Sequence, residues 1–270
     1  MVITNSQPEQ CVSVLDRGLA YGDGVFRTMR LYNQKVQQWP LHYAKLVADC
    51  ARLGIVCPAE TLLMQDILRS MQSKSEGIIK LIVTRGVGRR GYAPQPGAVP
   101  TRIVTYTPLP DYPTQHIQHG VKITVCALRL AHQPRLAGIK HLNRLEQVLA
   151  RAEWQDASIA EGLMLDQHGL PVCGTMTNVF ALSGRKLMTP NLDYCGVAGV
   201  TRSRILALAP ALGLEMEICP MTLETLLAAD EVMLCNSVIG IWSVSELAST
   251  RWRVGPLANT LREKLEQEND

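Results

Sequence analysis

Apolar residues recur along the chain at two spacings, one typical of helices and one of strands. Leu62, Leu63, Ile67 and Met71 are spaced as on one face of a helix. Residues 78–84 and 102–107 are short runs rich in β-branched residues, which indicates strands. We expect helices at 41–53, 59–73, 142–156, 201–212 and 257–268, and strands at 25–32, 35–39, 78–84, 102–107, 121–126, 162–165, 178–182 and 231–235. This mixture predicts an α+β fold.

The richest proline cluster of the chain is at 108–114. Proline interrupts both helices and central strands, so this segment is the best candidate for a linker. A chain of 270 residues is long enough for two modest domains. We expect an N-terminal α+β domain at 1–108, a linker at 109–120 and a C-terminal α+β domain at 121–270.

The composition indicates a soluble globular protein, with 47% hydrophobic and 19% charged residues. The formal net charge of +3 is too small to indicate nucleic acid or a membrane surface as a partner. The N-terminus lacks the pattern of a signal peptide. Eight cysteines are scattered without a CxxC pair, so we expect neither a metal site nor disulfides. Reduced thiols in a cytoplasmic protein are the simplest interpretation.

Residues 86–91 formally match the GxGxxG pattern of dinucleotide-binding folds. In those folds a helix begins at the last glycine, whereas here a proline-containing segment, 92–97, follows. We therefore reject a dinucleotide site and expect a flexible basic flap. Arg89, Arg90 and Tyr92 of this flap are available to an anionic substrate, although a solvated surface loop is the alternative.

A glycine-rich turn at 196–202 leads into an expected helix. Exposed amides and the positive end of the helix dipole make such a junction suitable for a phosphate group. Many similar turns bind nothing, so the motif alone leaves its function open. Cys235, Asn236 and Ser237 follow a buried strand and place small polar groups at its end.

Lys140 follows a glycine turn within an apolar run, at the expected start of a helix. Partial burial there would disfavour the charged form and lower the pKa of the lysine. A neutral amine is a nucleophile suited to forming a Schiff base. Most lysines near a helix start are simply solvated, so other segments are needed to choose between these interpretations.

Six segments together resemble a single family. They are DRGLAYGDGVF (16–26), RGVGRRGY (85–92), LAGIKHLNRLEQVLARAEWQ (136–155), TNVF (177–180), GVAGVTR (196–202) and DEVMLCNS (230–237). The chain resembles the fold-type IV pyridoxal-phosphate (PLP) enzymes, which include D-amino-acid and branched-chain aminotransferases. The segment around Lys140 is similar to the cofactor-lysine segment of 4-amino-4-deoxychorismate lyases. The resemblance implies a two-domain α+β fold, PLP as cofactor and a homodimer.

By this resemblance, Lys140 would bind PLP covalently. The other implied cofactor residues are Val200 and Thr201, through their amides, with Asn236 and Ser237 at the phosphate, Lys45, Cys173 and Asn178. Arg90 and Tyr92 are the implied substrate residues.

Two of these positions depart from the family pattern. Cys173, five residues before Asn178, stands where the family has a glutamate facing the pyridine nitrogen. A thiol with a pKa of about 8.5 is ionised to only roughly 3% at pH 7, so Cys173 would give a weaker electron sink. Lys45 stands in place of an arginine at the phosphate, which keeps the charge but loses the bidentate fork.

The leading functional hypothesis is an aminodeoxychorismate lyase, which makes 4-aminobenzoate and pyruvate for folate biosynthesis. Aromatisation drives this elimination, so a poor electron sink is better tolerated than in a transaminase. A fold-type IV amino-acid transaminase is the second hypothesis. The third is a paralogue with impaired catalysis, which the two departures motivate.

Overall fold

The computed structural model describes residues 1–268, and contacts divide them into two compact units. The first unit comprises Met1–Pro110 and Ile139–Asn143. The second comprises Asp111–Gly138 and the chain from Arg144 on. Among the described residues, no helix combines the length and the apolar character needed to cross a membrane.

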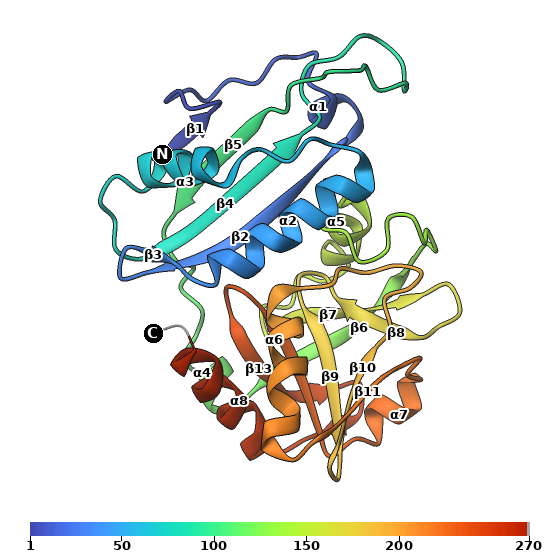
Figure 1. Cartoon of the computed structure of the whole chain (residues 1–270). Coiled ribbons are helices and arrows are strands. Elements are labelled where there is room, and N and C mark those ends of the chain that lie inside the picture. The colour runs from blue at the N-terminus through green and yellow to red at the C-terminus, as the bar shows by residue number, and fades with distance from the viewer. Residues whose placement is uncertain (269–270) are drawn as a thin grey trace. The chain divides into compact units, whose positions relative to one another are not determined.

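The first unit is built on a five-stranded antiparallel sheet of order β1-β5-β4-β2-β3. Its helices α2 and α3 pack against the sheet (Figure 1). The core forms between them, because alternate residues of β2 such as Val25, Met29 and Leu31 are fully buried. The elements are β1 (Val2–Thr4), α1 (Arg17–Tyr21), β2 (Gly24–Tyr32), β3 (Lys35–Val36), α2 (Trp39–Leu53), α3 (Glu60–Met71), β4 (Gly77–Thr84) and β5 (Arg102–Thr107).

The second unit contains a nine-stranded mixed sheet of order β11-β10-β9-β12-β13-β6-β7-β8, with β14 paired to β13. Helices α6 and α8 pack together against β12 and β13 (Figure 1). The strands are β6 (Val121–Leu130), β7 (Ile159–Asp166), β8 (Pro171–Gly174), β9 (Asn178–Ser183), β10 (Lys186–Pro190), β11 (Glu215–Cys219), β12 (Glu231–Asn236), β13 (Gly240–Leu247) and β14 (Thr250–Arg251). The helices are α4 (Gln115–Gln118), α5 (Leu145–Arg151), α6 (Val200–Leu208), the 3-10 helix η1 (Ala209–Leu212), α7 (Leu223–Leu227) and α8 (Pro256–Gln267).

Several predicted bounds differ from the structure. The strand expected at 162–165 is β7, Ile159–Asp166, and the helix expected at 201–212 is α6 followed by η1. The strand expected at 35–39 ends at Val36, because Pro40 occupies the first turn of α2, which begins at Trp39. The strand expected at 121–126 continues to Leu130. The helix expected at 142–156 is only α5, Leu145–Arg151, because the amide of Leu142 donates to the carbonyl of Gly24 instead of forming a helical bond.

The expected linker at 109–120 is partly a packed segment. From Asp111 on it belongs to the second unit, where Tyr112 and His116 contact the buried ring of Trp242 edge-on, at 5.1 and 4.8 Å between ring centroids. The sequence prediction placed Lys140 in the C-terminal domain, and the structure corrects this. Ile139–Asn143 packs with the first unit because it pairs with β2.

Candidate functional site

Lys140 lies on an extended segment beside β2, and not at the start of a helix as the sequence suggested. Its carbonyl accepts from the amide of Phe26 at 3.0 Å, and Val25 and His141 form an antiparallel bridge. The ammonium group lies 4.5 Å from the centroid of the Phe26 ring, a cation–π contact. The half-buried side chain of Lys140 is therefore positioned by a strand-like segment with a fixed backbone.

Asp49, on α2, joins Lys140 to Lys45. The carboxylate is fully buried and accepts from the amide of Lys140 at 3.1 Å. It also forms ion pairs with the ammonium of Lys45, at 2.5 Å, and with the guanidinium of Arg27. The structure thus brings together two of the predicted site residues, Lys45 and Lys140, around a carboxylate that the sequence reasoning did not single out.

Arg27 was also missed, although its position carried a signal. On β2 it occupies the same face as Val25 and Met29, so a charged side chain stands among core residues. Such a residue needs a buried partner of opposite charge. Asp49 is that partner, and Arg27 also donates to the carbonyls of Phe26 and Lys45 at 2.8 and 2.9 Å.

The charge of Lys45 is modulated by its surroundings. Burial lowers the pKa of its ammonium, and the hydrogen bond that Lys45 donates to Asp49 opposes that effect only in part. Arg27 nearby lowers the pKa further, since two cations repel one another. An additional anion at this position would stabilise the ammonium form of Lys45.

In the second unit, α6 begins at a glycine turn with its first amides uncapped by any side chain of the described residues. Gly199 precedes the helix, and a Cβ at this position would lie 2.4 Å from Oδ1 of Asn178. Only glycine therefore allows the Asn178 side chain to approach the backbone this closely. Asn178 is held in place by donating to the carbonyl of Val197 at 2.8 Å. The amides at the start of α6 have the polarity that favours an anion.

Two hydroxyls border the same helix end. Oγ of Ser237, just after β12, lies 3.3 Å from Oγ1 of Thr201 in the first turn of α6. Asn236 has a different environment: its side chain donates to the carbonyl of Met176 and accepts from the amides of Val238 and Ile239. The structure therefore brings Asn178, Val200, Thr201 and Ser237 together. The side-chain amide of Asn236 stabilises the turn that contains Ser237.

Cys173, on β8, belongs to a separate apolar cluster with Cys126, Trp154 and Met164. Burial raises the pKa of its thiol to about 12, and the nearby guanidinium of Arg144 lowers it only partly. The thiol is therefore protonated at neutral pH, so it cannot act as the anion that a glutamate would provide.

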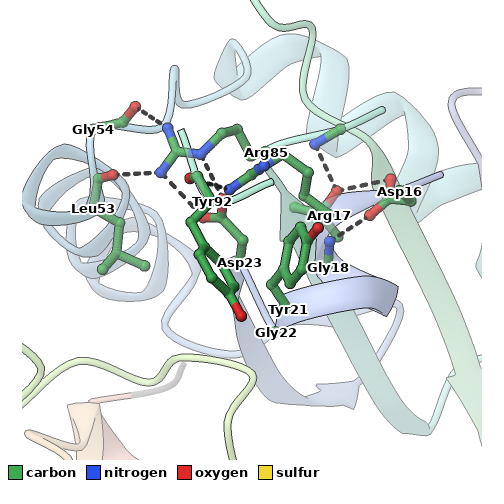
Figure 2. Close-up of polar contacts among 12 residues, drawn as sticks. Asp16, Arg17, Gly18, Tyr21, Gly22, Asp23, Leu53, Gly54, Arg85 and Tyr92 are labelled. Carbon is green, nitrogen blue, oxygen red and sulfur yellow. Dashed lines mark hydrogen bonds and ion pairs between the residues drawn. The ribbon is translucent and has the colours of Figure 1, made fainter. Parts of the chain in front are cut away.

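Arg90 and Tyr92 lie on the exposed loop between β4 and β5, in the first unit. The ring of Tyr92 is 84% exposed, and its centroid lies 5.4 Å from that of Tyr21 (Figure 2). The loop has no helix after its last glycine, as predicted, and Gly86 and Gly91 have φ values of 91° and 104°.

The chain has well-defined relatives among known proteins. The family described as amino-transferase class IV matches residues 24–247. An aminodeoxychorismate lyase from Vibrio harveyi is 35% identical over 92% of both chains. The crystal structure of 4-amino-4-deoxychorismate lyase from Pseudomonas aeruginosa superimposes with a TM-score of 0.95, at 45% identity over 99% of both chains.

A more distant likeness concerns the fold alone. The branched-chain amino acid aminotransferase of Escherichia coli has a TM-score of 0.89 at 22% identity, over 99% of this chain and 94% of its own. The two-domain α+β architecture expected from the sequence is thereby confirmed as that of the fold-type IV enzymes. Since the family match spans most of both units and several relatives cover nearly the full length, the chain belongs to the class IV aminotransferase family.

Proposed function

We propose that this protein is an aminodeoxychorismate lyase, a PLP-dependent carbon–oxygen lyase that converts 4-amino-4-deoxychorismate to 4-aminobenzoate and pyruvate for folate biosynthesis. The observation that carries the proposal is the 45% identity to the Pseudomonas aeruginosa lyase over 99% of both chains. The similarity to the Vibrio harveyi lyase supports it independently.

The residues present fit PLP. The first turn of α6, whose N-cap Gly199 provides no side-chain cap, and the neighbouring hydroxyls of Thr201 and Ser237 suit its phosphate. We propose that Lys140 holds the cofactor covalently. Within the second unit, the amide of Gly138 donates to the carbonyl of Gly196, and the carbonyl of Gly138 accepts from the amide of Ala198. The remaining cofactor contacts would come from Lys45, Cys173, Asn178, Val200 and Asn236.

When bound, PLP supplies an electron sink for the carbon that carries the substrate amine. The substrate amine would replace Lys140 on the cofactor, and the freed amine of Lys140 would then take the proton from this ring carbon. The enolpyruvyl oxygen leaves from the neighbouring carbon, and the ring becomes aromatic. Arg90 and Tyr92 on the exposed flap would bind the anionic substrate, since a guanidinium pairs well with carboxylates.

The protonated thiol of Cys173 favours the lyase over a transaminase. Transamination needs a strong sink at the pyridine ring, which a neutral thiol does not maintain, whereas aromatisation supplies driving force for the elimination. A transaminase is thus the second candidate. A paralogue with impaired catalysis is the third, because Lys45 and Cys173 replace the usual arginine and glutamate.

We also propose that the protein is a cytoplasmic homodimer. Leu145, Val148 and Leu149 form an apolar strip on α5 and are 74%, 59% and 58% exposed. A contiguous apolar strip of this kind is typical of a subunit interface. All eight cysteines are free thiols, which favours a reducing compartment. Sedimentation of a fully active monomer would contradict the dimer.

The decisive experiment is to incubate the purified protein with aminodeoxychorismate, with and without added PLP, and to measure 4-aminobenzoate and pyruvate. A parallel assay uses D-alanine or branched-chain amino acids with 2-oxoglutarate. Formation of both products, dependent on PLP, is expected. Efficient transamination without lyase activity would select the second candidate, and inactivity in both assays would select the third.

Borohydride reduction of the PLP-loaded protein, followed by peptide mapping, tests the lysine separately. The label should be found on Lys140 and should be absent from the Lys140→Ala variant. Lys45 forms an ion pair with Asp49, the carboxylate that also accepts from the amide of Lys140, and is the natural alternative. A label on Lys45 would identify Lys45 as the cofactor lysine.

A further inference from the structure

We propose that Arg17 is a positioning residue that latches the substrate flap, defined as residues 86–92, onto α1. The inference deepens the proposed function, because it rests on Arg90 and Tyr92 of the flap binding the substrate. Arg17 itself is buried, at 4% exposure, and is placed to hold the flap backbone in one path.

The guanidinium of Arg17 donates through all three of its nitrogens. Figure 2 shows it beside Asp23 and Tyr92. Nε forms an ion pair with Asp23 at 2.9 Å. The two terminal nitrogens donate to the carbonyls of Gly91 and Tyr92 at 2.9 and 2.8 Å. A planar guanidinium can serve two adjacent carbonyls and a carboxylate at once, whereas a lysine ammonium cannot reproduce that geometry.

Further bonds hold the rest of the flap against the same segment. The amide of Arg17 donates to the carbonyl of Gly86 at 2.9 Å, and the amide of Gly88 donates to the carbonyl of Leu15 at 3.1 Å. The amide of Gly91 donates to the hydroxyl of Tyr21 at 3.2 Å. At Gly88, a Cβ would lie 2.8 Å from Cδ of Arg17, so the flap approaches the arginine as closely as a glycine allows.

The contacts that Arg17 makes with residues 91 and 92 go to the main chain. They fix the path of the backbone and leave the side chains of Arg90 and Tyr92 exposed. A latch of this kind pre-organises the substrate-binding side chains without touching the reacting atoms. Its loss should therefore weaken substrate binding and leave the chemical step largely unchanged.

Asp23 also provides a matched control. Arg85 pairs with the same carboxylate, at 2.7 and 3.0 Å, but its remaining donors go to the carbonyls of Leu53 and Gly54 at the end of α2 (Figure 2). Arg17 and Arg85 thus both pair with Asp23, but Arg17 also bonds to the flap whereas Arg85 bonds to the end of α2. Replacing either by lysine perturbs Asp23, and only one replacement should release the flap.

Limited trypsin digestion tests the latch directly, because the flap contains exposed cleavage sites after Arg89 and Arg90. Cleavage at these bonds, identified by fragment mass, should be about tenfold faster in Arg17→Lys than in the wild type, since cleavage tracks the population of the opened loop. Arg85→Lys should change that rate less than about twofold. Tyr21→Phe, which keeps the ring and removes only the hydroxyl, should give an intermediate increase.

The kinetic readout distinguishes positioning from a role in chemistry. In Arg17→Lys, KM for aminodeoxychorismate should rise about tenfold while kcat changes less than about threefold. Wild-type cleavage rates in Arg17→Lys, or equal increases in Arg17→Lys and Arg85→Lys, would overturn the latch. If Arg17→Lys does not fold, the rate of flap cleavage in Tyr21→Phe is the test. A Tyr21→Phe cleavage rate equal to that of the wild type would then refute the proposal. Absence of lyase activity in the wild type would contradict the proposed function alone and leave the digestion result valid.

Discussion

Replacement of Asp49 by asparagine should strongly destabilise the first unit. Asp49→Asn keeps the shape of the side chain and removes its charge, which leaves the guanidinium of Arg27 buried without a compensating anion. The side chains of Asp49 and Arg27 are 0% and 3% exposed, so the stability cost typical of a buried ion pair applies, and not the cost typical of a surface pair. Removing one partner of a buried ion pair costs about 3–5 kcal/mol.

The other two contacts of Asp49 change this figure little. Lys45 is 22% exposed and can be hydrated when its partner is lost, which adds at most about 1 kcal/mol. An asparagine oxygen can still accept from the amide of Lys140. We therefore expect a loss of about 4 kcal/mol in the free energy of unfolding.

Urea unfolding measures this loss, and hydrogen exchange of peptides from β2 and α2 assigns it to the first unit. With a slope of roughly 3 kcal/mol/M, the midpoint should fall by about 1.3 M. Glu217→Gln, which breaks the exposed pair with Lys186, is the control and should leave the midpoint unchanged. The double variant Arg27→Met with Asp49→Asn should recover most of the loss, because it removes the buried guanidinium and keeps an acceptor for the amide of Lys140. A loss below about 1 kcal/mol in Asp49→Asn would refute the reasoning, since that is the range of a hydrated surface pair.

Three further predictions concern single carboxyl and thiol groups. Cys173→Glu should tighten PLP binding and raise any transaminase side reaction more than the lyase rate. The reason is that a carboxylate beside Arg144 would keep the pyridine nitrogen of PLP protonated. Weaker PLP binding in a direct titration would show that Cys173 does not face the pyridine nitrogen. Burial raises the pKa of Asp23, but Arg85 and Arg17 lower it more, to below its ordinary value of 3.8. The stability that Asp23 contributes should therefore be present above pH 3.8 and disappear as the pH falls through the folded-state pKa. Over that pH range, the difference in unfolding free energy between wild type and Asp23→Asn should shrink. A difference that stays constant would contradict the lowered pKa of Asp23. Burial raises the pKa of Glu231 above its ordinary value of 4.5. The wild type should therefore lose stability relative to Glu231→Gln as the pH rises from 4.5 through the folded-state pKa. If the unfolding free energies of the two proteins run parallel from pH 4 to 8, this effect is excluded.

Local patterns predicted the elements whose structure depends on local contacts. The strand at 102–107 has the predicted bounds, and the helix expected at 59–73 is α3, Glu60–Met71. The glycine turn before α6 and the loop at 86–91 were also recognised, because glycine and proline restrict the backbone locally.

Contacts between residues far apart in sequence explain what the patterns could not predict. Residues 142–144 have the composition of a helix start, but Leu142 bonds to Gly24, and a pattern in one segment cannot report its pairing with another. Asp49 lies within the helix expected at 41–53, and the pattern of that segment does not report its buried partner Arg27 on β2. Arg17 lies in the segment 16–26 that carries the family resemblance, while its partners Gly91 and Tyr92 lie 74 and 75 residues further on.

The grouping of Ile139–Asn143 with the first unit has a consequence for dividing the protein. A cut after Pro110, the natural site by chain order, would yield a C-terminal fragment that carries Lys140 without the β2 edge on which its backbone is bonded. Neither fragment would then present a complete lysine segment, because the N-terminal fragment lacks Lys140 and the C-terminal fragment lacks β2, to which the Lys140 segment is bonded. The two halves should instead behave as a split reporter: each silent alone, and active once tethering brings them together and the lysine strand docks onto β2.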